Sequence, residues 1–354
     1  MTSTTHPEFD EKTEALQVAA AFPSLIKDRT VLITGVNKLG IGFTTAEAFA
    51  SQGPRHLILA GRSDAKLQEA LDALRDLYPT IDYRLLHLDL SDLKSVKEAA
   101  ATVLSWTDVP TIDLLINNAG VMNIQQRTLS PQGIEMHLAT NHIGPFLFTN
   151  LILPRLIAAA KGSPPGTVRV VNVSSVGAFI SGLRVSDMNF TKPASELPDK
   201  EKPNLAMLKA SGLPADESTS YFPMVAYGHS KACNVLFAVV LNQKLHDKYG
   251  ILSLALHPGE IQSQLSRTTD QDWLTKVTTA RAAQGFAWKT LPEGASTTMV
   301  AALDPKLQRP GSDGHGYFLN NCQIGSVAPH ATDETDASKL WELSEDLVGE
   351  KFAW

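Results

Sequence analysis

The sequence contains little cysteine and little net charge, and each of these features disfavours certain classes of protein. Cys233 and Cys322 are the only cysteines in 354 residues, and neither belongs to a cluster with metal-ligand spacing, which disfavours a disulfide scaffold and a metal site. The formal net charge of −6 disfavours nucleic acid and anionic membranes as partners. With 43% hydrophobic and 19% charged residues, the composition is typical of a globular chain rather than a disordered one.

Long apolar runs are also missing. The first 28 residues carry charges early, and their longest apolar core extends only from Leu16 to Phe22, which is too short for a signal peptide or a membrane span. The most apolar later stretch, Ile143 to Ala160, is interrupted by polar residues and a proline, so we expect a buried helix there. We therefore predict a soluble, cytoplasmic protein with two reduced thiols.

Short apolar runs alternate with helical patterns along most of the chain. The run from Thr30 to Thr34 is rich in β-branched residues and is followed by a glycine, and residues 41–51 then have helical spacing. Further strands are expected at His56 to Ala60, Tyr83 to Leu88, Ile112 to Ile116, Val168 to Val173 and Ile251 to Leu256, and helices at Ala65 to Leu77 and, after a Ser91 cap, Asp92 to Leu104. This alternation predicts a doubly wound, mostly parallel α/β sheet of the Rossmann type.

One domain, residues 27–348, is expected between a polar N-terminal leader (1–26) and a C-terminal tail (349–354). Within the domain, residues 183–223 contain five prolines and little periodicity. A loop of this length in a compact domain is usually a lid, a binding loop or a mobile segment. We favour a lid over a peripheral ornament.

The first expected strand runs directly into a glycine-rich turn and then into a helix. Glycines in this context let the backbone approach a pyrophosphate at the N-terminus of the helix. A plain turn would use the same residues, so the motif alone leaves both interpretations open. The candidate cofactor contacts in the turn are Gly35, Lys38, Leu39, Gly40, Ile41 and Gly42.

The second expected strand is followed by Arg62, twenty residues after Gly42. At this position of a Rossmann-type site an acidic residue selects NAD, whereas an arginine accommodates the 2′-phosphate of NADP. Lys38 would add positive charge. Asp64 could instead hold a ribose hydroxyl, and Arg62 could be an ordinary surface arginine. We favour NADP(H), with NAD(H) as the alternative.

Tyr227 and Lys231 are four residues apart and therefore share one face of a helix. A free phenol has a pKa near 10 and is a poor acid–base catalyst at neutral pH. A lysine cation about 5 Å away supplies roughly 3 kcal/mol, or about two pKa units. We therefore expect Lys231 to lower the pKa of Tyr227. A packed tyrosine beside a solvated lysine would give the same short pattern.

Taken in order, the motifs resemble those of the short-chain dehydrogenases/reductases, and the similarity extends from about Lys27 to Val348. The ordered set is Thr34-Gly35 with Gly40 and Gly42, Asn117-Asn118-Ala119-Gly120, Asn141, Ser174-Ser175, Tyr227 with Lys231, and Pro258-Gly259. Residues 140–146, 320–322 and 340–342 are most similar to the branch that contains retinol dehydrogenases and WW-domain oxidoreductases.

The resemblance implies a role for each matching residue. Tyr227 would exchange a proton with the substrate oxygen, and Lys231 would lower the pKa of Tyr227 and hold the nicotinamide ribose. Ser175 would orient the substrate oxygen, and Asn141 would anchor a water on the proton path. The further cofactor contacts would be Asp89, Leu90, Asn118, Ala119, Gly120, Pro258, Gly259, Ile261 and Ser263, together with Tyr227 and Lys231.

Three features depart from the family pattern. The glycine turn has one residue more than the usual TGxxxGxG, and Ser263 stands where threonine is common. Ser175 and Tyr227 are separated by an unusually long stretch that includes residues 183–223. A segment between two catalytic residues must leave and re-enter near the active site, which is why we favour a lid. The choice of Ser175 over Ser174 rests on the family pattern.

Other chemically versatile residues are expected to be structural. Cys233 follows Lys231 closely and is expected in the core. A leucine and tryptophan stripe around Trp341 predicts a packed C-terminal helix. The histidines without metal-ligand spacing are His137, His142, His229, His246 and His257.

The expected function is an NADP(H)-dependent carbonyl reductase or alcohol dehydrogenase acting on a fairly apolar ketone, aldehyde or alcohol. The alternatives are a non-catalytic dinucleotide-binding or sensing protein, and a repurposed family member that couples NADPH reduction to cyclisation or isomerisation. Family members often pair through two helices, here those with Asn141 and Tyr227, so a homodimer or homotetramer is plausible and a monomer stays open. The apolar character of the substrate is inferred from Met188, Phe190, Met207, Tyr221 and Phe222.

Overall fold

An eight-stranded sheet in the order β3-β2-β1-β4-β5-β6-β7-β8 forms the centre of the molecule. The computed structural model describes residues 4–210, 212–213, 215–261, 265, 275, 278–279, 288–308 and 318–354. The strands are β1 (Thr30–Thr34), β2 (His56–Gly61), β3 (Asp82–His87), β4 (Leu114–Asn117), β5 (Arg169–Val173), β6 (Leu252–His257), β7 (Phe318–Asn320) and β8 (Gln323–Ile324). All neighbours pair in parallel except β7 and β8, so the predicted doubly wound, mostly parallel fold is confirmed.

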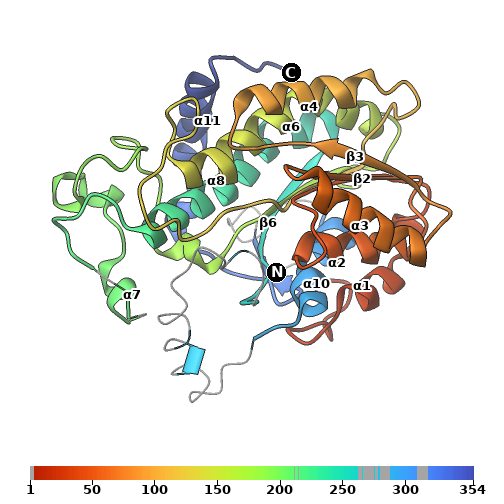
Figure 1. Cartoon of the computed structure of the whole chain (residues 1–354), viewed down its shortest axis with the longest axis horizontal. Coiled ribbons are helices and arrows are strands. Elements are labelled where there is room, and N and C mark those ends of the chain that lie inside the picture. The colour runs from red at the N-terminus through yellow and green to blue at the C-terminus, as the bar shows by residue number, and fades with distance from the viewer. Residues whose placement is uncertain are drawn as a thin grey trace.

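Helices cover both faces of the sheet (Figure 1). The helices are α1 (Ala15–Ala21), α2 (Ile41–Ala50), α3 (Asp64–Leu77), α4 (Leu93–Ser105), α5 (Met136–Leu138), α6 (Gly144–Ala160), α7 (Leu205–Ala210), α8 (Pro223–Tyr249), α10 (Leu291–Leu303) and α11 (Glu334–Val348). A π-helical turn, Ala139–Ile143, joins α5 to α6, and short 3₁₀ turns lie at Pro23–Leu25, Val176–Phe179, Ala194–Glu196, Asp199–Glu201 and Pro329–Ala331.

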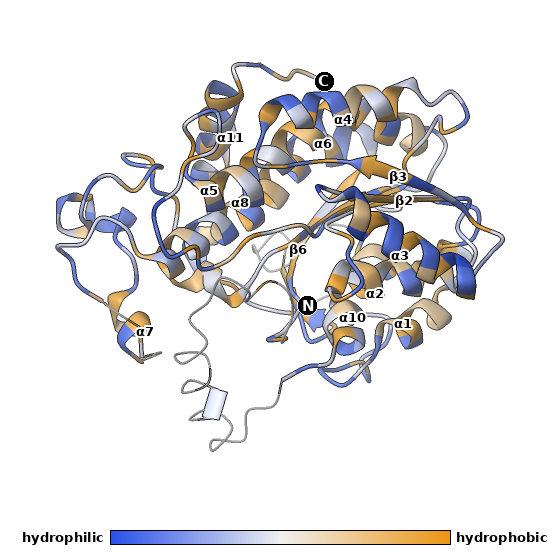
Figure 2. Cartoon of the chain, in the orientation of Figure 1, coloured by the Kyte–Doolittle hydropathy of each residue, from blue (hydrophilic) through white to orange (hydrophobic). Residues whose placement is uncertain are grey.

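The alternation of side chains along each strand separates two apolar cores. On β1, Leu32 points to the core shared with α4, α6, α8 and α11, whereas Val31 and Ile33 point to the core shared with α1, α2, α3 and α10. The outer helices are amphipathic, and Figure 2 shows polar and apolar residues alternating around α3. Strands buried on both faces explain the nearly continuous apolar runs of the sequence.

The described residues before β1, from Thr4 onward, pack on the domain. Helix α1 contacts α10 and α2, and the backbone N–H and hydroxyl of Thr5 donate to Asp304 at 2.7 and 2.6 Å. The apolar contribution of α1 is limited to three buried positions, Ala15, Val18 and Ala19. Three such residues among many charged ones are too weak a pattern to predict a packed helix.

The first turn of α4 also differs from expectation. Asp92, not Ser91, is the residue whose side chain accepts from a backbone N–H of the helix, at Lys94. The Ser91 hydroxyl instead donates to Asp89 at 2.6 Å. Either residue type can cap a helix, so sequence alone does not separate them.

Two helical stretches, Met136–Ala160 and Pro223–Tyr249, are long and apolar enough to cross a membrane by length and composition alone. Their most apolar windows are 67% and 94% buried inside the fold, respectively. They are therefore central helices of the domain, and the buried helix expected over residues 143–160 is confirmed by α6.

Helix α11 covers the face formed by α6 and α8. His142 and Ser344 form a hydrogen bond of 2.8 Å, and the Trp341 ring lies edge-on to Phe146 at 5.0 Å. The ring of Phe352 follows at 5.7 Å from Phe146, so the expected tail over 349–354 also packs on this face. Pairing through the helices that carry Asn141 and Tyr227 would require this cover to move, and the oligomeric state stays a prediction.

The inserted segment 183–223 (green, at the left of Figure 1) is organised around a buried ion pair. Arg184 and Asp187 are 1% and 7% exposed, and the Arg184 guanidinium lies 4.2 Å from the centre of the Phe190 ring. The segment is thus anchored at its base. Beyond this base, α7 extends away from the sheet.

Candidate active site

A cavity of about 1120 Å³ opens at the carboxyl ends of the parallel strands. The strand order reverses between β1 and β4, and a doubly wound sheet binds ligands at such a switch point. Residues far apart in the sequence line the cavity, from Thr34 at the end of β1 to Trp288 before α10. The described residues contain no cluster of three His, Cys, Asp or Glu side chains that could hold a metal.

Glycines form one end of the cavity because side chains would not fit there. A Cβ on Gly35, whose φ is +76°, would lie 2.7 Å from the Cα of Ala119, and one on Gly42 would lie 2.6 Å from the Nδ2 of Asn118. Thr34 joins the same two loops, since its Oγ1 accepts from the N–H groups of Asn118 and Ala119 at 3.1 and 3.0 Å. The N-terminus of α2 faces this cradle, which suits an anionic pyrophosphate.

Lys38 and Leu39 do not line the cavity, contrary to the role that the resemblance implied. The N–H of Gly40 donates to the carbonyl of Asn37 at 3.0 Å and closes a tight turn. The extra residue of the turn therefore places Lys38 and Leu39 at its exposed tip, where Leu39 is 61% exposed. Asn37 lines the cavity in their place.

Positive charge gathers where β2 leads into α3. Arg62 and Lys66 both line the cavity, and Ser63 caps α3 by accepting from the Lys66 N–H at 3.5 Å. Asp64 does not line the cavity and instead pairs with His87 at 2.8 Å. Lys66 was missed from the sequence, although its place in the first turn of the helix that follows Arg62 was the available signal.

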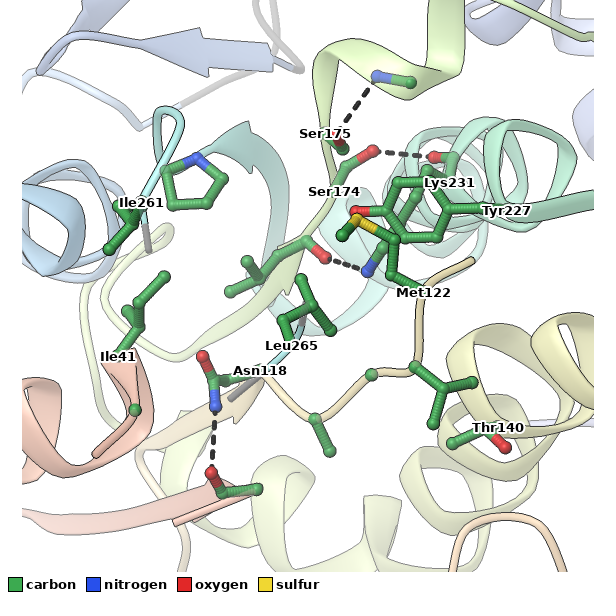
Figure 3. A pocket seen from close by; sticks show the side chains of 18 of the residues that line it. Ile41, Asn118, Met122, Thr140, Ser174, Ser175, Tyr227, Lys231, Ile261 and Leu265 are labelled. Carbon is green, nitrogen blue, oxygen red and sulfur yellow. Dashed lines mark hydrogen bonds between the residues drawn. The ribbon is translucent and has the colours of Figure 1, made fainter. Parts of the chain in front are cut away.

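Polar side chains in the loops after β3 and β4 also line the end of the cavity formed by the glycines. Asn118 Nδ2 donates to the carbonyl of Thr34 at 2.8 Å (Figure 3), and Asp89 accepts from the N–H and hydroxyl of Ser91. Both side chains serve the fold and also line the cavity. The other expected contacts that line it here are Gly40, Ile41, Leu90, Ala119 and Gly120.

Tyr227, Lys231 and Ser175 meet in the middle of the cavity (Figure 3). Tyr227 lies beside Ser175, whose hydroxyl accepts from the Gly177 N–H at 3.0 Å, and the amine of Lys231 lies 5.8 Å from the centre of the Tyr227 ring. Lys231 Nζ donates to the carbonyl of Val173 at 2.9 Å. Ser174 also lines the cavity, but its hydroxyl donates to the Lys231 carbonyl at 2.7 Å. The choice of Ser175 over Ser174 stays a prediction.

Burial dominates the electrostatics of this group. Burial raises the pKa of Tyr227 to about 12, with the neighbouring Ser175 hydroxyl opposing the rise. Burial also lowers the pKa of Lys231 to about 7. We expected Lys231 to bring the pKa of the phenol down, but removal from water outweighs that attraction here, since it disfavours both charged forms.

Asn141 lies behind the cavity wall rather than in it. Its Nδ2 donates to the carbonyl of Val121 and to Ser230 Oγ, both at 2.9 Å, and its Oδ1 accepts from the Val121 N–H. Its backbone carbonyl accepts from Asn234 Nδ2 at 2.6 Å. These contacts tie the loop after β4 to α8, and the π-helical turn that contains Asn141 provides the unusual backbone needed to reach both.

The loop after β6 also lines the cavity. Pro258, Gly259 and Ile261 line the cavity, with Gly259 in the left-handed region at φ +100°. His257 accepts from the Val176 N–H at 3.3 Å, and burial, aided by the Lys289 cation, lowers its pKa to about 4. Ser263, the remaining expected contact, lies outside the described residues.

The far end of the cavity is apolar. Residues of α7 and the turn after it contribute to its lining, which supports the expectation that part of 183–223 covers the site. Among the apolar residues that the sequence analysis named in this segment, Met207 lines the cavity. Phe190 does not, because it is fully buried at the base of the segment. The others that do not line it are Met188, Tyr221 and Phe222. The apolar wall consists of Ile180, Met207, Leu213, Met224, Leu265 and Trp288.

Comparison with known proteins agrees with this geometry. Residues 29–192 match the short chain dehydrogenase family model. The chain is 40% identical over 252 residues to oxidoreductase fscI of Fusarium equiseti, covering 71% of this chain and 94% of the relative. It is 31% identical over 325 residues to human retinol dehydrogenase 13, covering 92% and 86%. A solved structure of an uncharacterized protein from Mycobacterium paratuberculosis superposes with a TM-score of 0.65 at 28% identity, covering 95% and 98%. This chain belongs to the short-chain dehydrogenase/reductase family of oxidoreductases.

Proposed function

We propose that this chain is an NADP(H)-dependent oxidoreductase that interconverts a fairly apolar ketone or aldehyde with its alcohol and works chiefly as a carbonyl reductase. The observation that carries the proposal is the convergence of the Tyr227 and Ser175 hydroxyls between a glycine cradle and an apolar chamber. The relative retinol dehydrogenase 13 bears the name of an apolar alcohol, in keeping with such a chamber.

The residues present fit a phosphorylated dinucleotide. Gly35 and Gly42 leave room that a Cβ would fill, and the N-terminus of α2 offers free N–H groups to the pyrophosphate. Arg62 and Lys66 would hold the 2′-phosphate, and a guanidinium can do so through two hydrogen bonds. Asp64, which would favour NAD, is engaged by His87 outside the cavity.

Bound NADPH would supply the hydride that reduces the carbonyl carbon. Ser175 orients the carbonyl oxygen by a hydrogen bond, and Tyr227 donates its proton to that oxygen, so hydride and proton together give the alcohol. Lys231 holds the nicotinamide ribose, and its bond to the Val173 carbonyl fixes the amine at the cavity wall. The apolar chamber excludes water and receives the rest of the substrate.

The two reaction directions should respond differently to pH. A phenol that donates a proton is competent below its pKa, and burial raises that of Tyr227 to about 12. Protonation of Tyr227 should therefore not limit reduction between about pH 6 and 9, although Lys231, whose pKa burial lowers to about 7, titrates in that range. Oxidation, which needs the phenolate, should rise up to about tenfold per pH unit. Initial rates in both directions test this, and an oxidation rate that falls with pH would contradict it.

The two neighbouring serines should separate catalysis from stability. Ser175→Ala is expected to lower kcat/KM about 100-fold with little change in unfolding free energy, because Ser175 faces the substrate. Ser174→Ala is expected to lower the free energy of unfolding by about 1 kcal/mol, because it removes the buried hydrogen bond to the Lys231 carbonyl. Urea denaturation and steady-state kinetics measure both effects, and equal kinetic losses in the two variants would refute the assignment.

The proposal as a whole is tested by titrating the purified protein with NADPH and NADH and then following cofactor oxidation with a panel of apolar ketones and aldehydes. We expect tighter binding of NADPH and turnover with at least one bulky carbonyl. Failure to bind either dinucleotide would overturn the proposal. The cytoplasmic location stays a prediction.

A further inference from the structure

The peptide group of Ile124, in the loop that follows β4, is held from both sides by side chains that the proposed mechanism does not use. Its N–H donates to His137 Nε2 at 3.2 Å, and its carbonyl accepts from the Tyr221 hydroxyl at 2.7 Å. His137 lies in the first turn of the helical stretch that leads to Asn141, whereas Tyr221 lies near the end of the inserted segment. Three distant parts of the chain therefore meet at one peptide bond.

Glu135 determines which nitrogen of His137 carries the proton. His137 is fully buried, and its Nδ1 lies 2.7 Å from Oε1 of Glu135, which is also fully buried. Because Nε2 must accept from the Ile124 N–H, the ring proton belongs on Nδ1, where it is donated to the carboxylate. The second oxygen of Glu135 accepts from the Leu138 N–H at 2.9 Å, so both oxygens act as acceptors.

The loop held in this way forms part of the cavity wall. Met122 and Asn123 line the cavity, and Asn123 adopts a left-handed backbone with φ 54°. Figure 3 shows Met122 and Tyr227 directed into the same space. The His137 ring also lies edge-on to the Tyr227 ring at 6.3 Å, so one histidine contacts both the loop and the proton donor.

The inserted segment is fastened to the same loop region at two places. Besides Tyr221, Asn189 accepts from the Glu135 N–H at 2.8 Å through its side chain and from Arg127 Nε at 2.6 Å through its carbonyl. The Tyr221 ring packs edge-on against Phe190 at 6.2 Å. The part of the segment between these fastenings includes α7, whose residues reach the apolar end of the cavity.

We propose that Glu135, His137 and Tyr221 form a positioning device that fixes the loop 121–124 and the adjoining end of the inserted segment, and thereby sets how bulky a carbonyl substrate the chamber accepts. The proposal rests on the proposed function for its substrate class, but the positioning itself is a property of the fold. A fixed wall next to Tyr227 favours large apolar substrates that touch it, whereas a small aldehyde makes few contacts with it.

Two variants probe the device. Glu135→Gln replaces one acceptor oxygen with a donor, which must then face either His137 Nδ1 or the Leu138 N–H. If it faces His137, the ring proton moves to Nε2 and opposes the Ile124 N–H. Tyr221→Phe removes only the hydroxyl. The matched controls are Glu201→Gln, at a buried glutamate that binds Ser186, and Tyr83→Phe, at a buried phenol that donates to the carbonyl of Tyr78.

The first readout is substrate selectivity with benzophenone as the bulky ketone and propanal as the small aldehyde. Both device variants are expected to raise the KM for benzophenone about tenfold, while the KM for propanal, kcat and NADPH affinity stay within about twofold. The controls should match wild type. Equal losses for both substrates would show a general structural role and overturn the selectivity claim.

The second readout is hydrogen exchange of the backbone amides in peptide 121–127, which needs no turnover. Exchange there is expected to accelerate about tenfold in both device variants and in neither control. Unchanged exchange would overturn the positioning claim whatever the kinetics. Faster exchange in a protein that reduces no carbonyl would support the positioning claim while the proposed function fails.

Discussion

Tyr227→Phe should lower kcat/KM for carbonyl reduction by about 10³–10⁴-fold while NADPH affinity changes by less than about twofold. The substitution removes the proton donor but keeps the ring, which packs on Gly177 and lies edge-on to His137. Because the phenol is buried, water cannot easily replace its proton. Steady-state kinetics and a binding titration on the same preparation measure the two effects.

Tyr83→Phe is the matched control, since it removes a buried hydroxyl far from the cavity that donates to the carbonyls of Leu74 and Tyr78. The control should retain full activity. If Tyr227→Phe kept more than about a tenth of wild-type turnover, another group would have to supply the proton, and the assignment of Tyr227 would fail.

Arg62→Ala should weaken NADPH binding about 100-fold and leave NADH binding almost unchanged. The guanidinium can bind a 2′-phosphate through two charge-assisted hydrogen bonds, each worth more than a neutral one. Lys66→Ala should add a smaller loss, about fivefold, because an ammonium acts as a single point charge. Titrations at one fixed salt concentration give both values, since exposed charges are screened by salt.

Lys38→Ala provides the control for this experiment. Lys38 is an exposed cation at the tip of the glycine turn and does not line the cavity, so its loss should change neither affinity by more than about twofold. A large effect of Lys38→Ala, or tighter binding of NADH than NADPH by the wild-type protein, would overturn the cofactor assignment. The second result would direct attention to Asp64.

The sequence was most informative where one physical requirement determines the residue type. The strand over Thr30–Thr34 was predicted with its observed bounds, because a strand buried on both faces needs continuous β-branched residues. Gly35 and Gly42 were singled out as glycines of a turn between a strand and a helix, and in the structure a Cβ at either position would clash with Ala119 or Asn118. The order of motifs indicated further lining residues, including Tyr227.

The sequence was least informative where tertiary packing decides. The position of Lys38 depends on how one extra residue is accommodated in a turn, which spacing does not reveal. The pKa of Tyr227 depends on burial, and burial is a property of the assembled core rather than of a four-residue interval. Similarly, the partners of His137 come from residues 124 and 135, and its lack of metal spacing gave no hint of them.

The position of the inserted segment was predicted from the sequence, but the orientation of its side chains was not. Its length and its place between Ser175 and Tyr227 predicted a structure near the cavity, and α7 lies there. Which of its apolar residues face the cavity was not predictable, because Phe190 is held in the core by the Arg184 and Asp187 pair and by His229.

The most direct test of the central claim is the transfer of deuterium to a carbonyl substrate from NADPH labelled at both hydrogens of nicotinamide C4. Wild-type protein should place the label on the carbinol carbon of the alcohol product, and mass spectrometry of that alcohol should show one deuterium for each NADPH consumed. Tight NADPH binding without label transfer to any apolar ketone or aldehyde of the panel would contradict the account and favour a dinucleotide-sensing protein on this fold.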